Sequence, residues 1–135
     1  MKGVNRVVIV VKDIEKAGKL FSELIGIRLE DYGVVEDMGV RAMVSWDGGI
    51  ELVSPTRSDT DVARFLSEKG EGVYGVVFNV DDADKASDRA RRLGVRVKGT
   101  IEMGEKEGFR KFKEILLDPQ DTHNVFTLLG QIERR

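Results

Sequence analysis

The sequence predicts an α+β protein in which two copies of a βαβββ module follow each other along the chain. Three observations predict this fold class. An internal repeat aligns Arg6 with Gly75, an offset of 69 residues. A helical pattern of apolar residues then recurs between similar capping residues, and each copy continues as short β-branched runs bounded by turn residues.

The two copies open with matching strand and helix patterns. Arg6–Asp13 aligns with Gly75–Asp82, and both segments are apolar up to a closing aspartate. An aspartate is a good N-cap for a helix, and a glycine suits the left-handed position that ends one. In each copy an aspartate precedes the predicted helix and a glycine ends it: Asp13 and Gly26, then Asp82 and Gly94. The repeated helix faces are Ile14, Ala17, Phe21 and Leu24, then Ala83, Ala86, Ala90 and Leu93.

Each predicted helix leads into three predicted strands. In the first copy these are Ile27–Val35, Val40–Trp46 and Gly49–Val53, with a hairpin turn at Asp47–Gly49. In the second copy they are Val95–Met103, Phe109–Leu117 and Asn124–Leu129. A further short amphipathic helix is predicted after Pro55. No linker-like stretch divides the chain. We therefore expect one domain, with module one at about 1–57, a connecting helix at about 58–70 and module two at about 71–135.

Composition excludes several classes of protein. The 135 residues contain no cysteine, which excludes disulfides, thiolate catalysis and sulfur-based zinc sites. One histidine excludes any site that needs two imidazoles from this chain. The 22 basic and 24 acidic residues nearly balance, so we expect no nucleic-acid partner. The apolar run Val7–Val11 is too short for a signal peptide or a membrane span, so we expect no membrane partner and a cytoplasmic protein.

The tandem module resembles the vicinal-oxygen-chelate superfamily, which includes glyoxalase I, methylmalonyl-CoA epimerase, extradiol dioxygenases, fosfomycin-resistance enzymes and bleomycin-resistance proteins. The segments that carry the resemblance are Val4–Asp13, Ile50–Pro55, Gly72–Asp82 and Leu117–Val125, the last being most similar to epimerase-like members. The resemblance implies a U-shaped, cup-like mixed sheet with helices on its outer face. It also implies a homodimer, which would cover exposed sheet edges.

In metal-dependent members of this superfamily, each module supplies one metal ligand from its first strand and one from its last. Carried over to this chain, those positions are Arg6, Glu51, Gly75 and either Thr127 or Leu128. Only Glu51 is a ligand of the usual type, because arginine is a permanent cation that only donates hydrogen bonds. We therefore expect no metal site and no cofactor. The resemblance also suggests that histidines at positions 6 and 75, with a glutamate at 127 or 128, would rebuild a metal site. Histidine at position 75 would cost little if Gly75 lies in an ordinary strand, and would fail if something packs against its bare backbone.

Arg6 and Glu51 have two interpretations that the sequence leaves open. They form a structural ion pair, or Arg6 binds an anionic group of a ligand while Glu51 orients it or acts as a base. Three further residues complete the candidate ligand-binding set: Trp46, Thr127 and His123. His123 also fits a loop histidine without a catalytic role, and Tyr32 and Tyr74 fit packing roles. Leu20, Phe21 and Leu24 are predicted to be core residues.

Two classes of function follow. In the first, the protein binds a small anionic organic ligand without a metal, as bleomycin-resistance proteins sequester theirs. In the second, it is a lyase, an isomerase or epimerase, or a dioxygenase with a non-standard metal site, or a metal-free enzyme with Glu51 as general base. The missing metal ligands favour the first class, whereas Glu51 and the epimerase-like turn near Pro119 favour the second.

Overall fold

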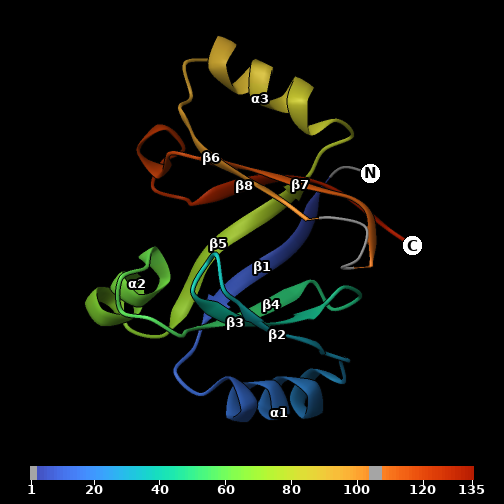
Figure 1. Cartoon of the computed structure of the whole chain (residues 1–135), viewed down its shortest axis with the longest axis vertical. Helices are drawn as coiled ribbons and strands as arrows, with labels where there is room; N and C mark the ends of the chain where they lie inside the picture. Colours follow the sequence, from blue (N-terminus) through green and yellow to red (C-terminus); the bar gives the residue numbers. More distant parts are fainter. Residues whose placement is uncertain (1–2, 104–107) are drawn as a thin grey trace. The chain divides into compact units, whose positions relative to one another are not determined.

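The computed structural model describes residues 3–103 and 108–135, which form strands and helices in the predicted βαβββ order (Figure 1). The elements of module one are β1 (Val4–Val10), α1 (Ile14–Ile25), β2 (Glu30–Val35), β3 (Val40–Ser45) and β4 (Ile50–Pro55). A connecting helix, α2 (Asp61–Lys69), follows. Module two consists of β5 (Gly72–Asn79), α3 (Ala83–Arg92), β6 (Val97–Glu102), β7 (Phe109–Leu117), the short 3-10 helix η2 (Pro119–Asp121) and β8 (Thr127–Arg134).

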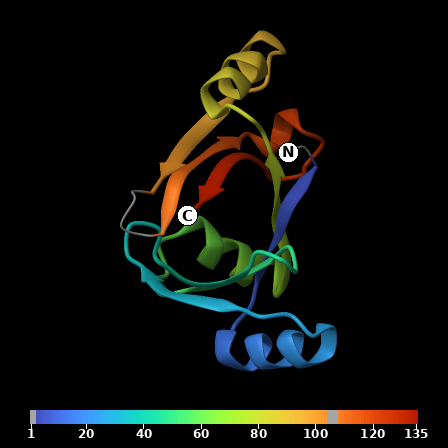
Figure 2. The ribbon, with the colours of Figure 1, turned by 90° about the vertical axis from the view of Figure 1, so that its right-hand side faces the viewer.

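The chain divides into two compact units, of which one comprises Arg6–Tyr74. Its strands are ordered β2-β3-β4-β1, with β1 and β4 parallel and the other pairs antiparallel. In the parallel pair, Val8 lies beside Glu51. Helix α1 packs on one side of β3 and β4 (Figure 2), and this contact forms a core around Ile14 and Leu52.

The second unit comprises Met1–Asn5 with Gly75–Arg135. Its strands are ordered β5-β8-β7-β6, again with one parallel pair, β5 and β8. Val77 lies beside Leu128 in that pair. Helix α3 packs on β6, β7 and β8, and its small face of Ala83 and Ala90 contacts Ile115. Both units therefore contain the mixed sheet and the covering helix that the repeat predicts.

The predicted helix caps are present in both modules. The Asp13 side chain accepts a hydrogen bond from the backbone N of Lys16, and the Asp82 side chain accepts one from the backbone N of Lys85, each at 3.1 Å. Gly26 and Gly94 both have left-handed backbones, with φ of 74° and 79°. These caps satisfy backbone groups that the helix itself leaves unpaired, which explains why they were readable from the sequence.

Some predicted boundaries and core residues are wrong. The first strand after each helix starts later than predicted, at Glu30 and at Val97, and β8 starts at Thr127 and not at Asn124. Leu20 and Leu24 are 57% and 72% exposed, whereas Phe21 packs against the core as predicted. The buried line of α1 runs through Ile14 and Gly18, and the two leucines lie outside that line. No described helix has the length and apolar character needed to cross a bilayer.

Candidate functional site

Arg6 and Glu51 form a buried ion pair. Arg6 lies on β1 and Glu51 on the adjacent parallel strand β4. The Arg6 Nε donates a hydrogen bond to the Glu51 Oε1 at 2.6 Å. The two side chains are only 5% and 13% exposed. A charged pair so far from solvent gains strongly from its own attraction, and either partner alone would be costly to bury.

Trp46 covers the guanidinium of this pair. The Arg6 Cζ lies 5.2 Å from the centroid of the Trp46 ring, within the range of a cation–π interaction. The Trp46 Nε1 donates to the Tyr32 Oη at 2.9 Å, and the Tyr32 Oη donates to the Glu30 Oε2 at 2.7 Å. Contacts thus connect five side chains from β1, β2, β4 and the residue after β3, namely Arg6, Glu30, Tyr32, Trp46 and Glu51. We call Glu30, Tyr32 and Trp46 the relay.

The second module has different residues at the corresponding positions. Val8 and Val77 are equivalent in the repeat, and Glu51 and Leu128 are their strand partners. This register makes Leu128, and not Thr127, the counterpart of Glu51. Leu128 is buried and apolar, while the Thr127 Oγ1 donates to the Val125 carbonyl at 3.0 Å. Module two therefore contributes no carboxylate at this position.

Gly75, the counterpart of Arg6, has no room for a side chain. A Cβ built on Gly75 would lie 2.9 Å from the Phe126 carbonyl oxygen and 3.0 Å from the Phe126 ring. That carbonyl is already held at 3.0 Å by the backbone N of Val76, so it cannot move freely. Of the two alternatives for histidine at position 75, the structure therefore supports the unfavourable one, because Phe126 packs against the bare backbone of Gly75.

The residues present do not fit the divalent metal that the superfamily resemblance implies. The four positions carry an arginine, a glutamate, a glycine and a leucine, a donor set with one carboxylate and a permanent cation. Within residues 3–103 and 108–135, no group of three or more His, Asp or Glu side chains could hold a metal ion. We therefore derive no catalytic step through a metal.

His123 and Tyr74, the other titratable aromatic residues that the sequence singles out, each have their own local surroundings. His123 is exposed in the turn after η2, with a left-handed backbone at φ 57°. Tyr74 contacts the Phe65 ring edge to face, with centroids 5.3 Å apart. Burial raises the pKa of Tyr74 to about 12, and the negative charge of Asp61 adds to that shift while Arg64 opposes it.

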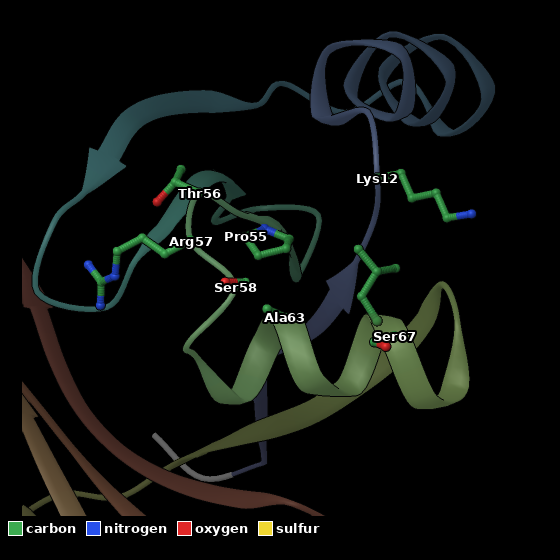
Figure 3. A pocket seen from close by; sticks show the side chains of 8 residues that line it. Lys12, Pro55, Thr56, Arg57, Ser58, Ala63 and Ser67 are labelled. Carbon is green, nitrogen blue, oxygen red and sulfur yellow. The ribbon is translucent and has the colours of Figure 1, made fainter.

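A separate surface cavity of about 550 Å³ lies between the end of β4 and α2 (Figure 3). Its cationic lining residues are Lys12 and Arg57, which point in different directions in the close-up. Arg57 already donates to Asp59 at 3.0 Å and to the Glu36 carbonyl at 2.6 Å. The bond to Glu36 connects the loop after β4 to the β2–β3 hairpin. We therefore assign Arg57 a structural role.

Sequence reasoning identified Arg6, Glu51 and Trp46 but not their connection to β2. The sequence favours a packing role for Tyr32 and gives no sign of a role for Glu30. The available signal was the spacing of Glu30 and Tyr32, which alternation along a strand places on one face. The hydrogen bond between Tyr32 and Trp46 depends on how β2 pairs with β3, which the spacing does not reveal.

The fold and these positions define the class of protein. The model of the glyoxalase/bleomycin resistance protein/dioxygenase superfamily matches residues 5–131, and the chain belongs to that superfamily. Among curated relatives, it is 28% identical over 131 residues to the ethylmalonyl-CoA/methylmalonyl-CoA epimerase of Cereibacter sphaeroides, covering 95% of this chain and 96% of the relative. It is 26% identical to the human mitochondrial methylmalonyl-CoA epimerase, covering 94% of this chain and 72% of the relative.

Solved structures show the same fold. A Streptomyces coelicolor methylmalonyl-CoA epimerase variant in complex with 2-nitronate-propionyl-CoA matches with a TM-score of 0.79 and 28% identity, covering 94% of each chain. A hypothetical protein from Bacillus halodurans matches with a TM-score of 0.86 and 17% identity, covering 99% of this chain and 96% of that one. The latter likeness concerns the fold alone.

Proposed function

We propose that this protein binds a small anionic organic ligand without a metal, and that Arg6 supplies the positive charge of the site. The observation that carries the proposal is the Arg6–Glu51 ion pair at positions where the resemblance implies metal ligands. Arginine binds carboxylates and enolates through a planar set of donors and keeps its charge at any physiological pH. Glu51 orients the guanidinium, and Trp46 provides an aromatic surface beside it.

We also propose Thr127 and His123 as polar contacts to a ligand. Both carry polar groups in the second unit, and His123 is exposed. Alanine substitutions at these positions would weaken binding by less than Arg6→Met does, because neither residue supplies a permanent charge.

Calorimetric titration tests the binding proposal, with methylmalonyl-CoA and free coenzyme A as probes. We expect binding that is unchanged after exhaustive dialysis against EDTA, and no stoichiometric metal by elemental analysis. Arg6→Met should weaken binding roughly tenfold or more, the scale of a charge-assisted hydrogen bond. The control is Arg64→Met, since Arg64 is an exposed arginine on α2. Loss of binding with EDTA, or equal affinity in Arg6→Met, would contradict the proposal.

A second candidate function is epimerisation of an acyl-CoA with Glu51 as general base. The similarity to methylmalonyl-CoA epimerases over nearly the whole chain favours it. Glu51 would take the proton from the carbon next to the thioester carbonyl, and Arg6 would offset the negative charge that develops. A proton from water would then return to the opposite face of that carbon, and Glu51 would release its own proton to water. Exchange of that proton with deuterium from D₂O, followed by NMR on methylmalonyl-CoA, tests it. Exchange that Glu51→Gln abolishes supports catalysis, and absence of exchange in the unmodified protein restricts the function to binding.

A further inference from the structure

The relay extends the Arg6 site to strand β2. Its hydrogen bonds run in one direction, from the Trp46 N–H to the Tyr32 hydroxyl and from that hydroxyl to the Glu30 carboxylate. The direction of both bonds is fixed, because the indole N–H only donates and the Glu30 carboxylate only accepts. The Tyr32 hydroxyl must therefore accept from Trp46 and donate to Glu30. Two contacts thereby hold the Trp46 ring: Tyr32 accepts from its N–H, and the Arg6 guanidinium lies over its face.

Tyr32 lies at an irregularity in β2 that also occurs in β6, between Val97 and Gly99. Asp31 pairs with Met43 and Gly33 pairs with Ala42, so Tyr32 is an extra residue in the strand. The bulge is stabilised locally, since the Asp31 Oδ1 accepts from the Gly33 backbone N at 2.8 Å and Gly33 has a left-handed φ of 67°. Here the bulge accompanies a tyrosine whose hydroxyl bonds to both Trp46 and Glu30.

We propose that Tyr32 and Trp46 are positioning residues that hold the Arg6 guanidinium in its ligand-binding orientation, with Glu30 orienting the Tyr32 hydroxyl. The proposal rests on the proposed function as far as the ligand is concerned, but the orientation of Arg6 is a property of the free protein. In the described part of module two, Gly75 and Leu128 replace Arg6 and Glu51, and β6 contains no tyrosine that could correspond to Tyr32. The relay accompanies the charged pair and is not a general feature of the βαβββ module.

The test observes Trp46 and Arg6 directly by ¹⁵N–¹H NMR of the free protein. Trp46 is the only tryptophan, so a single indole N–H signal reports on its bond to Tyr32. The Arg6 Nε–H signal is assigned by its loss in Arg6→Lys. We expect Tyr32→Phe to shift the indole signal and to speed hydrogen exchange at the Arg6 Nε–H about threefold to tenfold, the equivalent of one net hydrogen bond. Glu30→Gln should produce a smaller change in the same direction.

Tyr74→Phe is the matched control, because it removes the same hydroxyl from the other tyrosine, on β5. It should leave both signals in place. Urea unfolding of every variant separates a local change at Arg6 from a general loss of stability. The proposal is overturned if Tyr32→Phe leaves the Arg6 exchange rate unchanged, or if Tyr74→Phe has an equal effect.

Binding of methylmalonyl-CoA then separates positioning from packing. Trp46→Phe keeps an aromatic face for the guanidinium but loses the N–H, so it should weaken binding only as much as Tyr32→Phe does. The double variant should be no weaker than either single one, since both remove the same hydrogen bond. Trp46→Leu, which also removes the face, should bind more weakly still. Unchanged affinity in Tyr32→Phe would overturn the positioning role. If the unmodified protein binds neither probe, the proposed function fails. The Arg6 exchange rate then still tests whether Tyr32 and Trp46 hold the guanidinium in place.

Discussion

At Gly75 the absence of a side chain is a packing requirement of strand β5. A Cβ there would meet the Phe126 carbonyl at 2.9 Å, whereas a Cβ at Gly99 on β6 would meet nothing within 4 Å. We expect Gly75→Ala to lower the free energy of unfolding by about 1–3 kcal/mol, as crowding substitutions do. Gly99→Ala is the matched control and should leave stability unchanged or raise it by up to about 1 kcal/mol. Urea unfolding followed by circular dichroism measures both, and equal effects would contradict the crowding argument.

The buried charge of Glu51 depends on Arg6. Substituting Arg6 by methionine keeps an unbranched apolar stem but leaves that carboxylate without its 2.6 Å partner. Breaking a buried pair in this way costs about 3–5 kcal/mol. We expect Arg6→Met to lower the urea midpoint accordingly.

The matched comparison for this prediction is Arg64→Met, which removes an exposed arginine paired with Asp61. Exposed pairs contribute about 0–1 kcal/mol, so its midpoint should change little. Similar losses in the two variants would show that the Arg6–Glu51 pair is not protected from solvent.

Among the elements, α1 shows that apolar periodicity overestimates the buried face. Leu24 is 72% exposed although it continues the apolar pattern, while Ile14 is 5% exposed. We expect Leu24→Gln to change the free energy of unfolding by less than about 0.5 kcal/mol. Ile14→Ala should cost about 2–5 kcal/mol because it leaves a cavity between α1 and the sheet. A large loss in Leu24→Gln would indicate that a partner covers this face in solution.

The contact between α2 and β5 has a pH dependence through Tyr74. Burial raises the pKa of this phenol to about 12, above the value of about 10 for an unfolded chain. The folded state thus favours the neutral phenol. Its contribution to stability is complete below pH of about 10 and is lost as the pH rises toward 12. Absorbance at 295 nm should show one tyrosine ionising late. Tyr74→Phe should remove that late step, and its persistence in the variant would assign it to Tyr32.

For the whole molecule we propose a homodimer, as the superfamily resemblance and the exposed sheet edges imply. Strand β2 ends the strand order of one unit and β6 that of the other, and unpaired edges favour association. Light scattering at micromolar concentration should give twice the 15.1 kDa mass of the chain. A single species of 15.1 kDa would contradict the proposal.

Local interactions made much of this protein readable from its sequence. The helix caps at Asp13 and Asp82 involve residues only three positions apart. The internal repeat is found by comparing one segment of the sequence with another. Such patterns need no knowledge of the tertiary structure. They were sufficient to predict the α+β class and the βαβββ order, whereas the selection of Arg6 and Glu51 also needed the resemblance to the superfamily.

Tertiary structure decided what depends on strand register and on contacts between distant segments. It made Leu128 the counterpart of Glu51, because the pairing of Val77 across β5 and β8 sets that equivalence. It brought Phe126 against Gly75, exposed Leu24 and brought the Tyr32 hydroxyl to the Trp46 N–H. A one-residue change in register reverses which side chains face each other, and no local pattern reports it. The sequence therefore determined the module and its charged pair, while strand pairing determined the surroundings of that pair.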